Sequence, residues 1–150
     1  MIRTFAEWIG TVFYLGKLPL APGTWTSLVA TITWYFIFKD LNIYILPIVT
    51  SLLFILGVVS SNKIIRYRKE DDPSMIVIDE WVGQWLAFTM LPVTFQTGLI
   101  GFIAFRFFDI LKPGPVKRME RLPNGLGVMA DDVMAGILAY FIIIIYYLLF

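Results

Sequence analysis

The chain has 150 residues, of which 59% are hydrophobic and 15% charged, with a mean hydropathy of +0.79 and a net charge of +1. Soluble domains usually carry about 25% charged residues, so this composition predicts one membrane-embedded domain, residues 1–150. The small net charge argues against a nucleic-acid partner. Because cysteine and histidine are absent, disulfides, zinc–thiolate sites, cysteine nucleophiles and histidine bases or ligands are excluded.

Long uncharged stretches alternate with short polar connections. A spanning helix needs about 20 mostly apolar residues, and a first helix near residues 3–15 is too short, so we expect it to lie at the interface or to re-enter. Strands are not expected, because open sheet edges are not tolerated in lipid. The sequence predicts an all-α polytopic membrane helical bundle with four to five spanning helices. The candidate spans lie near residues 24–38, 42–62, 75–91, 95–111 and 130–150.

Basic residues are concentrated in two connections, residues 62–75 and 112–127, and Arg3 and Lys17 precede the first candidate span. The connections around residues 39–41 and 92–97 have no net charge. Five alternating spans place every basic-rich connection on the same side, which is expected to be cytoplasmic. The C-terminus is then predicted to lie outside.

Six ionisable residues fall within or beside the predicted spans, where such groups are costly and usually functional. The turn between the third and fourth spans centres near residue 94, and Asp79 and Asp109 are equally far from it. An antiparallel hairpin therefore places both at similar depth. The last span enters from the same side, so three acidic clusters converge on one level. The six residues are Asp79, Glu80, Arg106, Asp109, Asp131 and Asp132.

Five carboxylates held close together need a compensating charge. Mg²⁺ is the natural candidate, because it prefers oxygen ligands. Arg106 shares a helix face with Asp109 and is well shaped to bind phosphate. Two further segments flank the same level and offer hydroxyls, amides or close backbone approach. They contribute Thr24, Thr26, Ser27 and Asn124.

Each signal also has a purely structural interpretation. The acidic pairs could be ordinary acids at helix starts, Arg106 and Asp109 could form a structural ion pair, and the hydroxyls could only cap a helix. Asp71 and Asp72 precede Pro73 and are expected to lie in a solvated turn. An ion or metal transporter would use the same carboxylates but would favour sites at the membrane midplane. A structural membrane subunit would leave the ionisable groups unexplained.

The sequence resembles phosphatidylglycerophosphatase A, a family of bacterial membrane enzymes that dephosphorylate phosphatidylglycerophosphate to phosphatidylglycerol. The resemblance covers nearly the whole chain, although Thr26 stands where the family pattern has glycine. The matching segments are APGTWTS (21–27), DDPSMIVIDEWVGQW (71–85), FRFFDILKPGPVKRME (105–120) and NGLGVMADDVMAGILA (124–139).

The resemblance implies a Mg²⁺-dependent lipid phosphatase of the cytoplasmic membrane, with its site at the cytoplasmic face. It adds Lys112 to the six ionisable residues. We expect Mg²⁺ ligands among Asp79, Glu80, Asp109, Asp131 and Asp132, and phosphate or headgroup contacts from Arg106, Lys112, Thr24, Thr26, Ser27 and Asn124. Asp79, Asp131 and Arg106 are the candidate catalytic residues. Attack by water and an aspartyl-phosphate on Asp131 or Asp79 both stay open, and a lipid-headgroup phosphotransferase is the alternative enzyme.

Overall fold

The computed structural model describes residues 2–71 and 73–150, and every regular element among them is helical. The predicted all-α class is therefore confirmed. Asp72, predicted to lie in a solvated turn, and the side chain of Arg3, predicted to help orient the chain, lie outside what the structure describes. In chain order the elements are α1 (Ile2–Gly10), the 3-10 helix η1 (Leu15–Lys17), α2 (Pro22–Ile37), α3 (Ile45–Arg68), α4 (Ile78–Ala87), α5 (Phe95–Leu111), α6 (Gly114–Met119) and α7 (Asn124–Leu149).

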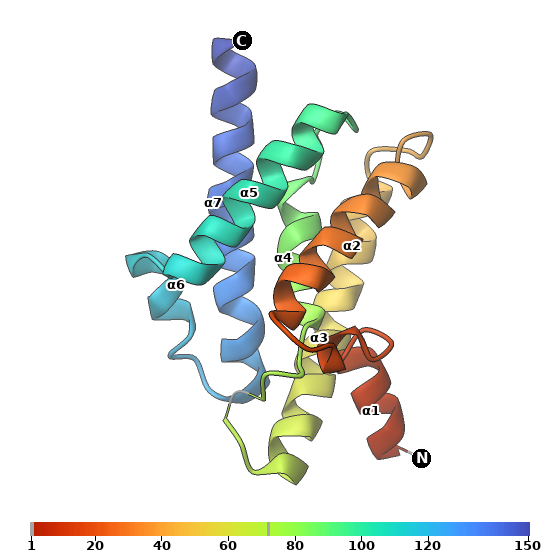
Figure 1. Cartoon of the computed structure of the whole chain (residues 1–150), viewed down its shortest axis with the longest axis vertical. Coiled ribbons are helices and arrows are strands. Elements are labelled where there is room, and N and C mark those ends of the chain that lie inside the picture. Colours follow the sequence, from red (N-terminus) through yellow and green to blue (C-terminus); the bar gives the residue numbers. More distant parts are fainter. Residues whose placement is uncertain (1, 72) are drawn as a thin grey trace.

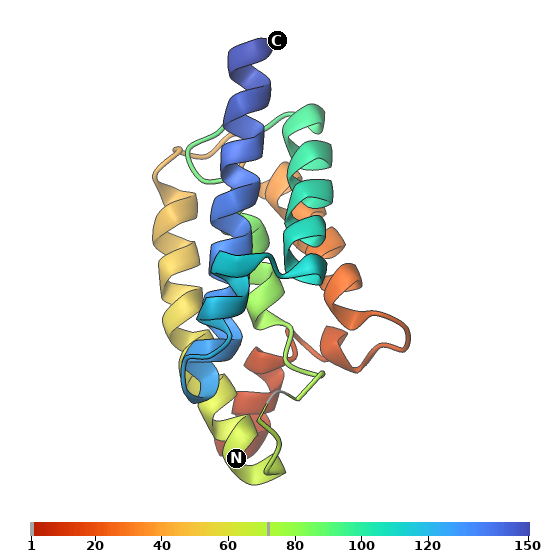
Figure 2. The same ribbon diagram turned by 90° about the vertical axis from the view of Figure 1, so that its left-hand side faces the viewer.

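The longest helix, α7, ends at one tip of the molecule (Figure 1). It contacts α3, α4, α5 and α6, and α4 also contacts α2, α3 and α5. The short helix α4 is therefore enclosed by the others. The α2–α3 and α4–α5 connections lie toward the C-terminal tip, whereas the α3–α4 and α6–α7 connections lie toward the opposite end (Figure 2).

Apolar side chains surround most of α4, as expected for a helix enclosed by others. Val82 and Phe88 are at most 1% exposed. The ring of Phe88 stacks on Trp34 of α2 with centroids 4.1 Å apart. The indole of Trp85 donates a hydrogen bond of 2.9 Å to the carbonyl of Ala30. These contacts hold α4 against α2.

Two helices, α3 and α7, are long and apolar enough to cross a membrane. Only 28% of the residues in the apolar stretch of each are buried inside the protein, whereas a core helix of a soluble protein would be mostly buried. Other outer faces are also apolar, because Phe36 of α2 is 76% exposed and Phe95 of α5 is 70% exposed. Such an exposed apolar surface indicates association with a membrane. Four to five spans stay a prediction.

The third predicted span, residues 75–91, is much shorter in the structure, where α4 has ten residues. Before it, the Val77 amide donates a 2.9 Å hydrogen bond to the last residue of α1, which holds the chain in an irregular segment. After it, Pro92 cannot continue a helix. Asp79 and Glu80 therefore lie in the first turn of α4, where the helix dipole favours acids, and their predicted place several residues inside a span is wrong.

The last helix begins at Asn124, earlier than the predicted start at residue 130. Pro123 precedes it in extended backbone, and the amide of the second helical residue donates a 2.9 Å hydrogen bond to Asn62 Oδ1 of α3. Asp131 and Asp132 consequently lie about two turns inside α7. The interpretation that they only cap the start of this helix is wrong.

The basic residues after residue 62 do not end α3, which continues to Arg68. Ile64 and Ile65 remain buried on its inner face, while Lys63 is exposed. The apolar period therefore extends the helix through the charged segment. The short helix α6 was not predicted.

The N-terminal helix α1 is shorter than the predicted residues 3–15 and packs against α3. Tyr67 of α3 donates a 2.7 Å hydrogen bond to Glu7 Oε1, and Lys17 Nζ lies 3.4 Å from Glu7 Oε2. The bond from Tyr67 is the main cause that holds the pKa of Glu7 below its usual value. Phe5 and Trp8 are exposed on α1, and its place at the membrane interface stays a prediction.

Candidate active site

A pocket of about 530 Å³ opens where the first turns of α2, α4 and α7 meet the end of α5. Asp79 and Asp109 lie together in it, as the hairpin spacing predicts. It also contains the other three carboxylates predicted as metal ligands. The lining residues are Pro22, Asp71, Ser74, Ile76, Asp79, Glu80, Asp109, Lys112, Glu120, Leu122, Asn124, Val128, Asp131 and Asp132.

Close contact between the backbones of α4 and α7 brings their acids together. A Cβ added at Gly136 would collide with the carbonyl oxygen of Gly83 and lie 3.2 Å from its Cα. Only glycine permits this approach. Both helices run from the pocket toward the C-terminal tip (Figure 1). Asp79 and Asp132 each precede their glycine by one helical turn, so the contact also places these two carboxylates side by side.

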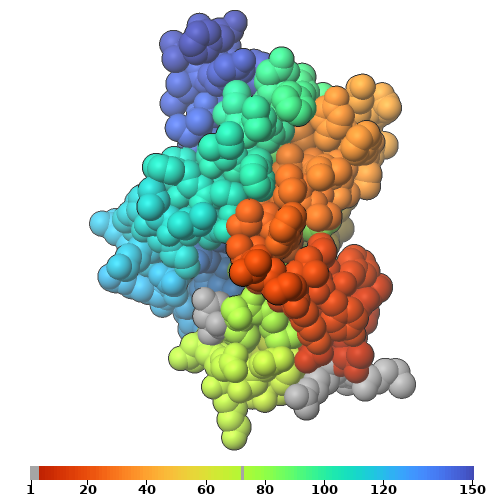
Figure 3. Space-filling model, viewed as in Figure 1, coloured from red at the N-terminus to blue at the C-terminus, as the bar shows by residue number. Residues whose placement is uncertain are grey.

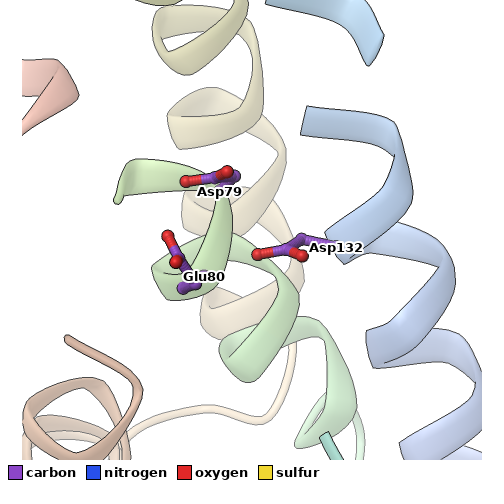
Figure 4. A group of neighbouring side chains, drawn as sticks. All are labelled: Asp79, Glu80 and Asp132. Carbon is purple, nitrogen blue, oxygen red and sulfur yellow. The ribbon is translucent and has the colours of Figure 1, made fainter. Parts of the chain in front are cut away.

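Asp79, Glu80 and Asp132 form an acidic cluster in which one oxygen of each carboxylate lies within 4.8 Å of the others (Figure 4). Asp132 is 2% exposed. Asp79 Oδ1, Glu80 Oε2 and Asp132 Oδ2 are buried and have no hydrogen-bond partner within the described residues. Buried polar oxygens without partners are costly, and hard divalent cations bind oxygen ligands of this kind. This donor set therefore fits Mg²⁺.

Asp109 lines the pocket and is paired with an arginine of the same helix. Arg106 Nη1 hydrogen-bonds to Asp109 Oδ2 and lies 3.5 Å from Ser27 Oγ, which itself donates to the Gly23 carbonyl at 2.9 Å. A Cβ added at Gly23 would collide with Glu80 Oε1 and lie 3.3 Å from Arg106 Nη1. The start of α2 therefore packs directly against both the acidic cluster and the arginine.

Lys112, just after α5, connects two acids of the pocket. Its Nζ lies 2.8 Å from Asp131 Oδ2 and 3.0 Å from Glu120 Oε1. Burial by itself lowers the pKa of Lys112, but the hydrogen bonds and charges of these two partners outweigh it and raise the pKa above its usual value. Asp131 Oδ1 also accepts from the Asp132 amide at 3.0 Å. Both oxygens of Asp131 thus have protein partners.

The three hydroxyls at the start of α2 do not line the pocket. Thr26 is fully buried, and its Oγ1 has no partner among residues 2–71 and 73–150. The N-cap of α2 is Ala21, whose methyl side chain cannot accept a hydrogen bond from the helix amides. Ser27 reaches the site only through Arg106. A direct phosphate contact from Thr24, Thr26 or Ser27 stays a prediction, whereas Asn124 lies in the pocket wall.

Sequence reasoning missed Glu120 and the close-contact glycines. Glu120 is the one acid in the basic connection 112–127, a signal that could have marked it. Gly83 and Gly136 each follow a predicted ligand by four residues. That spacing could have indicated a backbone contact one turn below the acids.

Sequence comparisons identify the family of the chain. The family model described as phosphatidylglycerophosphatase A matches residues 8–147. The chain belongs to the phosphatidylglycerophosphatase A family. The predicted family and the predicted enzyme class, a phosphatase, are therefore confirmed. No solved structure matches the chain.

Three relatives are similar to most of the chain. Phosphatidylglycerophosphatase A of Haemophilus influenzae is 40% identical over 133 residues, which cover 87% of this chain and 82% of the relative. The Escherichia coli K12 protein of the same name is 33% identical over 130 residues, or 85% and 74% of the two chains. A Bacteroides thetaiotaomicron protein named "Putative phosphatidylinositol-3-phosphatase" is 38% identical over 142 residues, or 90% and 89%.

Proposed function

We propose that this protein hydrolyses the terminal phosphate of phosphatidylglycerophosphate in a Mg²⁺-dependent reaction, giving phosphatidylglycerol and phosphate. The observation that carries the proposal is the group of buried carboxylate oxygens that have no partner among the described residues and that belong to residues lining one pocket. The chain also belongs to a family of phosphatases. The names of the Haemophilus influenzae and Escherichia coli relatives support the lipid substrate.

Asp79, Glu80 and Asp132 would hold the metal, with Asp109 as a fourth ligand. Mg²⁺ held there would supply positive charge to neutralise the phosphate and would help to activate the attacking water. Asp131 is the weaker ligand candidate, because Lys112 and a backbone amide already occupy its two oxygens. The same pairing argues against Asp131 as the nucleophile of an aspartyl-phosphate, and Asp79 has the freer oxygen.

The protonated Lys112 would contact the phosphate, because Lys112 lines the pocket and its Nζ is paired with two acids that also line it. Asp131 and Glu120 would orient this ammonium group. Arg106 would neutralise phosphate charge while it holds Asp109 in place. Asn124 would contact the glycerol part of the headgroup.

We also propose a multi-pass protein of the bacterial cytoplasmic membrane with this pocket at the cytoplasmic face. The basic segments before α4 and between α5 and α7 lie toward the pocket end of the bundle, which supports this orientation. In addition to α3 and α7, helices α2 and α5 have 16 and 17 residues, near the lower limit for a span. The end position of the pocket also argues against a transporter, which would favour a midplane site.

Phosphate release from phosphatidylglycerophosphate in detergent micelles tests the function. We expect activity with Mg²⁺ and none with EDTA. Asp79→Asn, Asp109→Asn and Asp132→Asn should each lose most activity while the thermal unfolding transition is retained. Asp40→Asn, in the exposed α2–α3 connection, is the matched control and should keep full activity.

Full activity in EDTA, or in all three pocket variants, would refute the metal site. Phosphatidylinositol 3-phosphate is the comparison substrate, because one relative carries the name of a phosphatase for that lipid. If phosphate were released faster from phosphatidylinositol 3-phosphate than from phosphatidylglycerophosphate, the proposed substrate would be wrong.

A further inference from the structure

A second cavity, of about 330 Å³, lies between α2 and α5 on the outside of the bundle. Leu28 and Ile32 of α2 and Leu99 and Phe102 of α5 are among its aliphatic and aromatic walls. The Thr31 hydroxyl, which also lies there, donates to the carbonyl one turn earlier at 2.9 Å. The cavity therefore presents an almost entirely apolar surface, which we call the α2–α5 groove.

This groove leads toward the polar pocket. Leu28 directly follows Ser27, and Phe102 precedes Arg106 by one helical turn. Ser27 Oγ and Arg106 Nη1 are 3.5 Å apart and join the two helices at this end. Asp109, less than one turn further along α5, lines the polar pocket. The two helices lie side by side on the face shown in Figure 3. Residues of both line the groove, and the start of α2 and the end of α5 line the polar pocket.

We propose that the α2–α5 groove binds one fatty acyl chain of the phospholipid substrate while its phosphorylated headgroup occupies the polar pocket. Hydrocarbon matches the apolar walls, and the anionic headgroup matches the ammonium of Lys112. From Arg106 to Phe95, α5 rises about 16 Å, close to one leaflet of a hydrocarbon core about 30 Å thick. The distance along α5 is thus comparable to the length of one acyl chain, because one layer of such chains makes up each half of the hydrocarbon core.

This arrangement would make the enzyme prefer a lipid substrate to a free phosphate ester. The metal and Lys112 recognise phosphate chemistry that many soluble esters share. A chain held along α2 and α5 aligns the headgroup with the acidic cluster and adds binding energy far from the reacting phosphate. The inference rests on the proposed function for the identity of the headgroup.

Filling the groove tests the proposal. Leu99→Trp enlarges a half-exposed groove residue, and Leu52→Trp makes the same change on α3, away from the groove. The two leucine side chains are 49% and 57% exposed. Each variant is assayed with long-chain phosphatidylglycerophosphate in mixed micelles and with its water-soluble deacylated headgroup. The larger indole of Leu99→Trp should displace at least two methylenes of the acyl chain from the groove. Because each buried methylene contributes to affinity, the apparent KM for the long-chain lipid should rise about tenfold.

Leu99→Trp should hydrolyse the deacylated headgroup at the wild-type kcat/KM, and Leu52→Trp should match the wild type on both substrates. An unchanged KM for the long-chain lipid in Leu99→Trp would overturn the proposal. Equal effects of both tryptophans, or equal losses on both substrates, would also overturn it.

A binding measurement separates this proposal from the proposed function. Phosphatidylglycerophosphate with a diazirine on one acyl chain is photolysed with the wild type and with each variant, and the labelled peptides are mapped. We expect labelling of α2 and α5 that Leu99→Trp reduces and Leu52→Trp does not. Labelling spread evenly over α3 and α7 would refute the groove, whereas failure of phosphate release alone would refute only the enzymatic proposal.

Discussion

The contact between Gly83 and Gly136 leads to a sharp prediction, because it sets the distance between two predicted metal ligands. In Gly136→Ala, the new Cβ would overlap the Gly83 carbonyl oxygen and lie 3.1 Å from the Gly83 carbonyl carbon. These are backbone atoms of a neighbouring helix, so no side chain can rotate away. The helices would have to separate by on the order of 1 Å, and a displacement of that size can cost about 100-fold in rate.

We therefore expect Gly136→Ala to lower the rate of phosphate release about 100-fold and to destabilise the fold by about 1–3 kcal/mol, the usual cost of overpacking. Phosphate release and thermal unfolding in detergent measure the two effects. Gly114→Ala is the control, because a Cβ there meets no atom within 4 Å, and it should change neither. Wild-type activity in Gly136→Ala would show that this backbone contact does not position Asp132.

Two further predictions concern the edges of the site and of the fold. In Gly23→Ala the new Cβ would displace the Glu80 carboxylate, which is the end of a flexible side chain. Phosphate release should therefore fall at least several-fold while the unfolding temperature stays near that of the wild type, and a large loss of stability with normal activity would contradict this reading. In Glu7→Gln the hydrogen bond from Tyr67 loses its charged acceptor. The pKa of folded Glu7 lies below its ordinary value of 4.5. The charge of Glu7 therefore stabilises the fold fully at pH values above 4.5, and this stabilisation is lost as the pH falls through the folded pKa. The variant should unfold at a slightly lower temperature than the wild type at pH 7, and the difference should disappear in acid; an undiminished difference at pH 3 would refute the role of the charge.

The lysine–aspartate pair shows how packing distinguishes residues that look alike in sequence. Asp131 and Asp132 are adjacent acids with the same chemistry. In the structure, Asp131 faces Lys112, whereas Asp132 has a buried oxygen without a partner in the described part of the chain. Their proposed roles differ for that reason, and nothing in the local sequence separates them.

Several features follow from the sequence alone. The scarcity of charged residues indicates a chain suited to lipid, because a short soluble domain needs more polar surface than this one has. Helical rise per residue is constant, so equal distances from the turn near residue 94 place Asp79 and Asp109 at one level. The matching segments identify the family, and the spacing of the acids identifies the candidate site.

Tertiary structure decided which way each side chain faces and where each helix begins. The α4 helix has only ten residues because Val77 is held by α1 and Pro92 stops continuation. The hydroxyls of α2 lie away from the pocket wall because α2 packs its glycine, not Thr24 or Thr26, against Glu80. Composition and spacing determine depth along a helix. Rotation about the helix axis and the contact of Gly83 with Gly136 depend on neighbouring helices that are distant in the chain, so only the packed bundle determines them.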